Sequence, residues 1–267
     1  MVTPPEPAAP GFAPALLAWT AAGRRHLASR LDPAHGLQGF STHLSVSTPG
    51  TPGTPGTPGT PGTRGERICH LATRTFGPGL MLVLDGPSSH GIAIRPRPGR
   101  AELCGEFADG DRLAAAAVFW TGAVLATTAA AGGDPSARAQ LPPPVAANTA
   151  PDVERYGWVL YRNAFGFDLY AQGRTGRFER ASGGTISAQS HLELAWEGAR
   201  AALEGVTSHA ELALVDAMVA GRLPLGIEDP RPSARPMDHD MPRRPVFGEV
   251  LETSCAGPYE AVAVIAT

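Results

Sequence analysis

The feature that most constrains the fold is an alanine-rich segment without a single charge, residues 114–131. Alanine is the strongest helix former, so the segment predicts one helix that opens around residues 109–111 and closes at Gly132 and Gly133. Its length approaches that of a bilayer span, but alanine and threonine insert weakly compared with leucine or isoleucine. We therefore expect a buried core helix around which the rest of the chain packs.

The second informative feature is the absence of lysine, since all 22 Lys and Arg residues are arginines. Without lysine, the chain has no Walker A loop, no protein-kinase β3 lysine, no Schiff base to pyridoxal phosphate and no lipoyl or biotinyl attachment. GC-rich codons favour Arg, Ala, Gly and Pro, so the same fact indicates a bacterium with a high-GC genome. The net charge of −3 has no long block of one sign, so neither nucleic acid nor a membrane is an expected partner.

The three cysteines and the first residues predict a cytoplasmic protein. An odd number of cysteines and a proline-rich start without a basic and then apolar export signal favour reduced thiols. No CxxC pair, HExxH helix or G-x-G-x-x-G fingerprint occurs, so we expect no metal site and leave the cofactor open.

The chain divides into three parts. Residues 1–47 predict an N-terminal helix over 14–31 and a strand over 43–47. Residues 48–67 are a low-complexity Gly-Thr-Pro loop with glycine at every third position. The collagen-like period covers too few triplets for a triple helix, so we expect an extended surface loop. Residues 68–267 are the main domain.

Short apolar runs between glycine and proline punctuate the start of the main domain. They predict four strands of an antiparallel meander, over residues 68–75, 80–85, 91–95 and 101–107. After the core helix and a proline-rich connection, residues 158–162 and 167–172 predict an aromatic hairpin. Two final runs, 246–252 and 259–266, are expected to complete the sheet.

Two capping boxes, Ser190 with Glu193 and Ser208 with Glu211, predict a pair of consecutive helices. The second helix carries an apolar face and no basic recognition surface, so the pair is expected to be a packing element and not a DNA-binding motif. The predicted fold class is α+β, with a largely antiparallel sheet covered by the long apolar helix and this αα-hairpin.

The strongest candidate for chemistry is the loop from Asp85 to Gly91, which carries Ser88, Ser89 and His90. An imidazole beside a carboxylate can act as a general base, and either serine can be a nucleophile or a hydrogen-bond donor. We therefore expect His90 as the base, Asp85 as its orienting acid, and Ser88 and Ser89 as further catalytic candidates. The alternative is that Asp-Gly-Pro-Ser is an ordinary turn without a catalytic role.

Three other groups have weaker signals. Arg174 and Arg177 lie in a glycine-rich loop and are candidate contacts for an anionic substrate. The triplet Asp238-His239-Asp240 has metal-ligand types, but adjacent residues do not easily face one ion. Cys255 is expected to be a bystander thiol.

Together these features predict a small-molecule metabolic or biosynthetic enzyme that uses acid/base chemistry on an anionic or acyl-type substrate. The alternative is a non-catalytic accessory or binding subunit of a biosynthetic complex, whose exposed apolar surface docks a partner. The sequence leaves open whether the chain is catalytic at all. A homo-oligomer, in which an arm over residues 223–245 crosses to a neighbour, is a further possibility.

Overall fold

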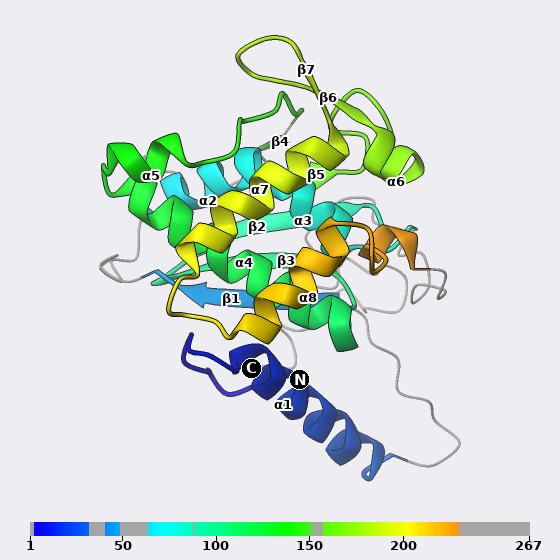
Figure 1. Cartoon of the computed structure of the whole chain (residues 1–267). Coiled ribbons are helices and arrows are strands. Elements are labelled where there is room, and N and C mark those ends of the chain that lie inside the picture. Colours follow the sequence, from blue (N-terminus) through cyan, green and yellow to red (C-terminus); the bar gives the residue numbers. More distant parts are fainter. Residues whose placement is uncertain are drawn as a thin grey trace, which may run out of the picture.

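The computed structural model describes residues 3–31, 41–48, 64–87, 89–148, 150–151 and 157–229. At its centre lies α4 (Gly110–Ala131), the alanine-rich helix (Figure 1). By length and composition α4 could cross a membrane, but 83% of its apolar window is buried inside the protein. Its Trp120 is fully buried and donates its indole NH to the carbonyl of Leu44 at 2.9 Å. The predicted helix is therefore confirmed as a core element.

The main sheet has five strands in the order β1-β3-β2-β5-β4, and every pairing is antiparallel. The strands are β1 (Ser41–Ser47), β2 (Gly91–Arg97), β3 (Arg100–Glu106), β4 (Ala150–Pro151) and β5 (Trp158–Tyr161). The strands expected over 43–47, 91–95 and 101–107 are thus confirmed as β1, β2 and β3.

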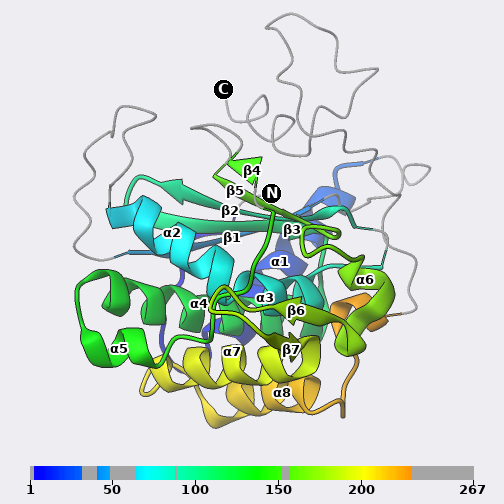
Figure 2. The ribbon, with the colours of Figure 1, turned by 90° about the horizontal axis from the view of Figure 1, so that it is seen from above.

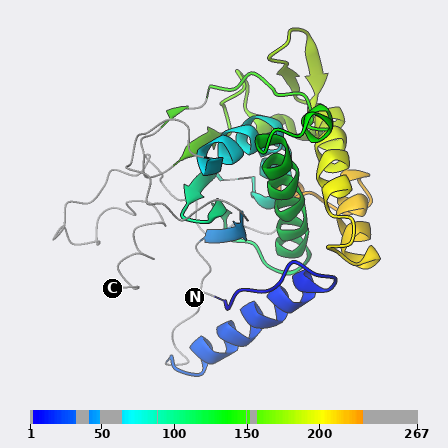
Figure 3. The same cartoon turned by 90° about the vertical axis from the view of Figure 1, so that its left-hand side faces the viewer.

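The helices form layers on one side of this sheet (Figures 2 and 3). Nearest to the strands lie α2 (Arg64–Thr75), α3 (Gly77–Leu84) and α4. The αα-hairpin of α7 (Ala188–Ala202) and α8 (His209–Val219) packs on the far side of α4. The fold is therefore α+β, a largely antiparallel sheet with a long apolar helix and an αα-hairpin, as the sequence predicts.

Two of the four expected meander strands are helices, which corrects the sequence analysis. In α2 the buried residues recur at helical spacing, at Ile68, Cys69, Ala72 and Thr73. This period distinguishes a helix from a strand, whereas the β-branched content of the run favours a strand. In α3 every residue is buried, so the run has no periodicity that could separate a buried strand from a buried helix.

The expected aromatic hairpin is also wrong in its second half. Strand β5 pairs with β2 and β4, and the residues after it form the short helix α6 (Leu169–Gln172). Asp168 caps this helix by accepting from the amides of Tyr170 and Ala171. An N-cap carboxylate therefore decides the local structure against the aromatic strand propensity.

Small elements join the layers. They are α5 (Pro135–Ala139), the 3₁₀ turns η1 (Gly173–Thr175) and η2 (Gly226–Glu228), and a two-stranded hairpin of β6 (Arg177–Glu179) and β7 (Thr185–Ser187).

Of the two expected capping boxes, the one at Ser190 is wrong and the one at Ser208 is confirmed. Helix α7 begins earlier than expected, because Ser187 caps it by accepting from the amide of Ser190. The box of Ser208 and Glu211 on α8 is confirmed. The Glu211 carboxylate also accepts from the amides of Gly11 and Ala13, at 2.9 and 2.8 Å, and so joins α8 to the start of α1 (Phe12–Ala28).

Helix α1 lies at the edge of the protein and extends beyond it (Figures 1 and 3). Ala13 is buried, but Trp19 and Leu27 further along the helix are 47% and 42% exposed, and Leu31, just after the helix, is 42% exposed. The apolar spacing that predicts this helix therefore does not mark a buried face over its second half.

Several predictions fall outside the described residues. These are residues 49–63 of the Gly-Thr-Pro loop expected over 48–67, Ser88, the triplet Asp238-His239-Asp240, most of the 223–245 arm, Cys255 and the two C-terminal strands. The end of that expected loop, residues 64–67, is wrong, because it forms the first turn of α2.

Candidate functional site

The Asp85 carboxylate is the centre of a buried hydrogen-bond cluster between α3, β3 and α6. Asp85 directly follows α3 and is fully buried. Its Oδ2 accepts from the hydroxyl of Ser89 at 2.7 Å and from the hydroxyl of Tyr170, and its Oδ1 accepts from the amide of Glu106 at 2.9 Å. Both oxygens of the carboxylate are thus held in one orientation.

A second carboxylate completes the cluster. Glu106, the last residue of β3, accepts from the amide of Gly86 at 2.6 Å. The approach depends on glycines, because a Cβ at Gly105 would lie 2.7 Å from Asp85 Oδ1 and one at Gly226 would lie 2.5 Å from the Asp85 carbonyl. The chain therefore places small residues where its backbone must pass close to these acids.

Burial sets the protonation of the Asp85 carboxyl. Desolvation raises the pKa of Asp85 from 3.8 to about 7, and the hydrogen bonds from Tyr170, Glu106 and Ser89 only partly oppose it. Desolvation, together with the nearby Asp85, also raises the pKa of Tyr170 well above its ordinary value. Near neutral pH the Asp85 carboxyl therefore exists in both protonated and ionised forms.

An arginine that the sequence analysis does not identify holds the loop beside Asp85. Arg162 donates to the carbonyls of Pro87 and Ser89, at 3.0 and 3.4 Å, and pairs with Asp168 at 2.8 Å. Its guanidinium also lies 5.2 Å from the centre of the Tyr170 ring. Asp168, in turn, caps the helix that carries Tyr170, so these contacts fix the loop and the phenol together.

The structure brings together only part of the expected catalytic set. Asp85 and Ser89 are in direct hydrogen-bond contact, and Ser88 is outside the described residues. His90 is half-buried directly before β2, and its carbonyl accepts from the Arg162 amide at 2.9 Å. Its role as a base stays a prediction. Tyr170 and Glu106 have no local sequence signal, because they reach Asp85 from distant parts of the chain.

The two candidate substrate arginines have different surroundings. Arg174 donates to both carboxylate oxygens of Glu228, to the side chain of Gln189, and to the carbonyls of Met218 and Val219 at the end of α8. Because a guanidinium has five NH donors, a substrate would have to displace one of these bonds.

Arg177 is exposed and lies in a shallow groove of about 560 Å³ beside α7. The groove also contains Arg180, Glu193 and Glu197, so its two positive charges face two negative ones. The role of both arginines in substrate binding stays a prediction.

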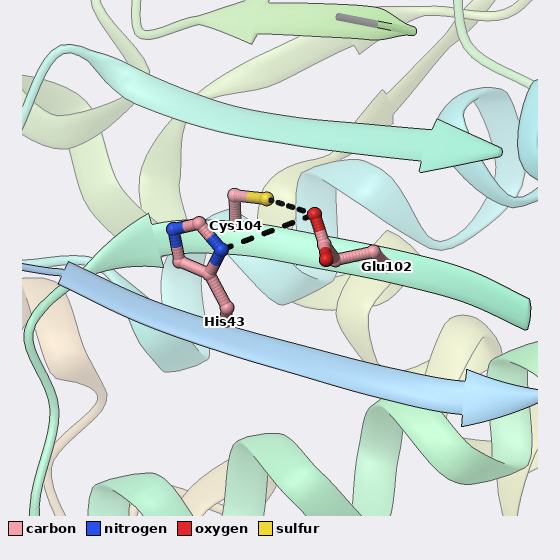
Figure 4. Close-up of side chains that lie close together, drawn as sticks. All are labelled: His43, Glu102 and Cys104. Carbon is pink, nitrogen blue, oxygen red and sulfur yellow. Dashed lines mark hydrogen bonds and ion pairs between the residues drawn. The ribbon is translucent and has the colours of Figure 1, made fainter. Parts of the chain in front are cut away.

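A second cluster lies on the main sheet, on neighbouring positions of β1 and β3 (Figure 4). His43 is opposite Cys104 in the register. Glu102 Oε1 lies 3.9 Å from His43 Nδ1 and accepts from the Cys104 thiol at 3.4 Å. Imidazole, thiolate and carboxylate are zinc ligands, and their donor atoms lie within 4.8 Å of one another.

The charges around this cluster do not fit a metal ion. Arg95 Nη2 forms a salt bridge with Glu102 Oε1 and also lies 3.4 Å from His43 Nδ1. Arg97 lies 3.5 Å from the same carboxylate oxygen. A guanidinium therefore already occupies the place between the two ligands that a cation would take, and a second one stands beside it.

The pKa shifts agree with an arginine-bound carboxylate. Burial and the charge of Arg95 lower the pKa of His43 to about 4. Burial raises the pKa of Cys104, which keeps the thiol protonated. Burial alone would raise the pKa of Glu102, but Arg95 and Arg97 hold it below its ordinary value.

Comparison with known proteins gives no relative: no family model, no curated protein and no solved structure matches this chain.

Proposed function

We propose that this chain is an enzyme that acts on a small acyl-type substrate by acid/base chemistry, with Ser89 as the nucleophile and Asp85 as its base. The observation that carries the proposal is the buried Asp85 carboxyl with a pKa of about 7, hydrogen-bonded to the Ser89 hydroxyl at 2.7 Å. A group with a pKa near the working pH can both take a proton and return it.

The two residues differ in access, which suits these roles. Ser89 is only half-buried, whereas Asp85 is fully buried. In the proposed reaction, Ser89 Oγ attacks the acyl carbon and its proton passes to Asp85 Oδ2. The bond between the acyl carbon and the leaving group then breaks, and the carboxyl gives its proton to that group. Water, with Asp85 again as the base, then releases the acyl group as a carboxylic acid, and the proton returns to Ser89 Oγ. Tyr170 keeps its hydrogen bond to the same oxygen and orients it.

His90 stays a second candidate for proton transfer, because it directly follows Ser89 and is half-buried. In this proposal Asp85 acts on Ser89 rather than on His90, since its side-chain oxygen accepts a hydrogen bond from the serine hydroxyl. Ser88 remains an alternative nucleophile that the experiment has to separate.

A fluorophosphonate probe, which reacts with activated serine hydroxyls, tests the proposal. We expect the full chain to be labelled at Ser89, with a rate that rises through about pH 7 as Asp85 ionises. Ser89→Ala should abolish labelling, Asp85→Asn should slow it by about a hundredfold, and Ser88→Ala and Ser190→Ala should leave it unchanged. An unlabelled native chain, or label that persists in Ser89→Ala, would contradict the proposal.

A second function, a non-catalytic accessory or binding subunit, is favoured by a different observation. Of the four large apolar side chains exposed in the described part of the chain, Trp19, Leu27 and Leu31 lie on α1 or just after it. The helix carries no acid, and Arg24 is paired with Asp109 at 3.2 Å, so Arg25 favours a partner surface that is apolar with an acidic group.

This alternative is tested by cross-linking in the native host, followed by mass spectrometry. A partner with an acidic surface should be lost from the double variant Trp19→Ser/Leu27→Ser. It should be retained in Leu194→Ser, which removes the fourth exposed apolar side chain, on α7. A cross-linking pattern that is the same in all three proteins would contradict docking through α1.

A further inference from the structure

The β2–β3 hairpin places three arginines on one face of the sheet. Side chains alternate along a strand, so Arg95 and Arg97 of β2 share a face with Arg100 and Glu102 of β3. The register confirms this, since Arg95 is opposite Glu102 and Arg97 is opposite Arg100. Among the described residues of this hairpin, three positive charges on this face therefore meet one carboxylate.

The single carboxylate is mainly committed to Arg95. The salt bridge between Arg95 and Glu102 is shielded from water, with 5% and 9% of the two side chains exposed. Arg97 reaches the same Glu102 oxygen only through its Nε, at 3.5 Å, and its side chain is 29% exposed. The terminal nitrogens of Arg97 thus point to no other carboxylate in the described part of the chain.

Arg100 has even fewer partners. It is exposed, and among the described residues its side chain makes no salt bridge or side-chain hydrogen bond. By contrast, the guanidinium of Arg174 donates hydrogen bonds to Glu228 and to the carbonyls of Met218 and Val219. Within the described part of the chain, the guanidinium groups of Arg97 and Arg100 therefore have NH donors without an acceptor.

The turn fixes these two arginines opposite each other. Pro98 and Gly99 link them, and Gly99 has φ +69°, which a proline-glycine turn of type II requires at its glycine. Like charges directly opposite each other on a sheet are unfavourable unless a counter-charge lies between them. A group with two negative charges and several acceptor oxygens matches two guanidinium forks.

We propose that Arg97 and Arg100 form a binding site for a phosphate monoester group, with Arg95 and Glu102 as the buried support that holds Arg97 in place. Ser47, which is opposite Arg100 in β1, offers a further hydroxyl at the same end of the sheet. The site lies at the end of β3 opposite Glu106, about 20 Å away along the strand. It is therefore separate from the Asp85 cluster and does not depend on the proposed serine chemistry.

Isothermal titration with inorganic phosphate at low ionic strength tests this site in the full chain. We expect Arg97→Gln/Arg100→Gln to weaken phosphate binding by about tenfold or more for each arginine removed. The matched control Arg138→Gln, which removes an exposed arginine on α5, should bind phosphate like the native chain. Acetate, with a single charge, should bind more weakly than phosphate.

Two further measurements separate the outcomes. The double variant loses the contact between Arg97 and Glu102 but also a like-charge pair, so its unfolding temperature should stay close to that of the native chain, and lost binding would not reflect lost folding. Vesicles that contain phosphatidic acid distinguish a lipid headgroup from a free phosphate ester as the source of the group. Equal phosphate affinity of the double variant and the native chain, or no phosphate binding by the native chain, would overturn the proposal.

Discussion

Replacing Asp85 by asparagine should remove a pH dependence of the stability of this protein. The Asp85 carboxyl has a pKa of about 7 in the folded chain and an ordinary value of 3.8. Between these values the folded state holds a proton that the unfolded state has released. The stabilisation is thus fully present below the lower pKa and is lost as the pH rises through about 7.

The magnitude follows from the two pKa values. Their difference corresponds to about 4 kcal/mol of unfolding free energy over the whole window, of which about 2.5 kcal/mol falls between about pH 5 and pH 8. Asparagine is nearly isosteric and cannot ionise. Its amide can donate to the hydroxyl oxygens of Ser89 and Tyr170 while its carbonyl accepts from the Glu106 amide, so the cluster keeps its hydrogen bonds.

The assay is urea unfolding followed by tryptophan fluorescence, at several pH values across this window. We expect the native chain to lose stability relative to Asp85→Asn as the pH rises. Asp111→Asn, at an exposed acid in the first turn of α4, controls for a change of charge and should follow the native chain. A difference between the native chain and Asp85→Asn that stays constant to about 0.5 kcal/mol would refute a buried carboxyl that is protonated near neutral pH.

Two further substitutions test the packing and the sheet cluster. Gly122→Ala should destabilise the protein by about 1–3 kcal/mol, because the new methyl would collide with the Ala199 carbonyl where α4 crosses α7. Calorimetry measures this change, and an unchanged unfolding temperature in Gly122→Ala would contradict the close approach. Glu102→Gln should lower the free energy of unfolding by about 3–5 kcal/mol, since it leaves the buried Arg95 without its carboxylate. Because Arg95 and Arg97 lower the pKa of Glu102, the stabilisation by this carboxylate should be present above pH 4.5 and fade as the pH falls below it. Urea unfolding of the native chain and of Glu102→Gln checks this, and equal stability at neutral pH would contradict the buried salt bridge.

Local patterns were sufficient where one physical effect dominates. The uncharged alanine run predicts α4, since such a segment has to be buried and prefers a helix. The capping box predicts the start of α8. Alternating residues between turns predict β2 and β3. Local patterns failed for α3, because a segment that is apolar on all sides fits a buried strand and a buried helix equally well.

The candidate site was only half visible in the sequence. Asp85 and Ser89 stand close enough along the chain to suggest a shared site. Tyr170, Arg162 and Glu106 lie far from them in sequence and meet them only after α6 and β3 are in place. No local pattern identifies such partners, because their contact depends on how separate elements pack.

The sequence by itself determined the helical core, the antiparallel character of the sheet and the α+β class, since these follow from local propensity and from the burial of apolar side chains. Only the tertiary structure decided the chemistry of individual groups. Burial at the end of α3 gives Asp85 its raised pKa, and the β2–β3 register sets Arg97 opposite Arg100. Desolvation and charge proximity are properties of the folded arrangement, so neither can be derived from the order of residues alone.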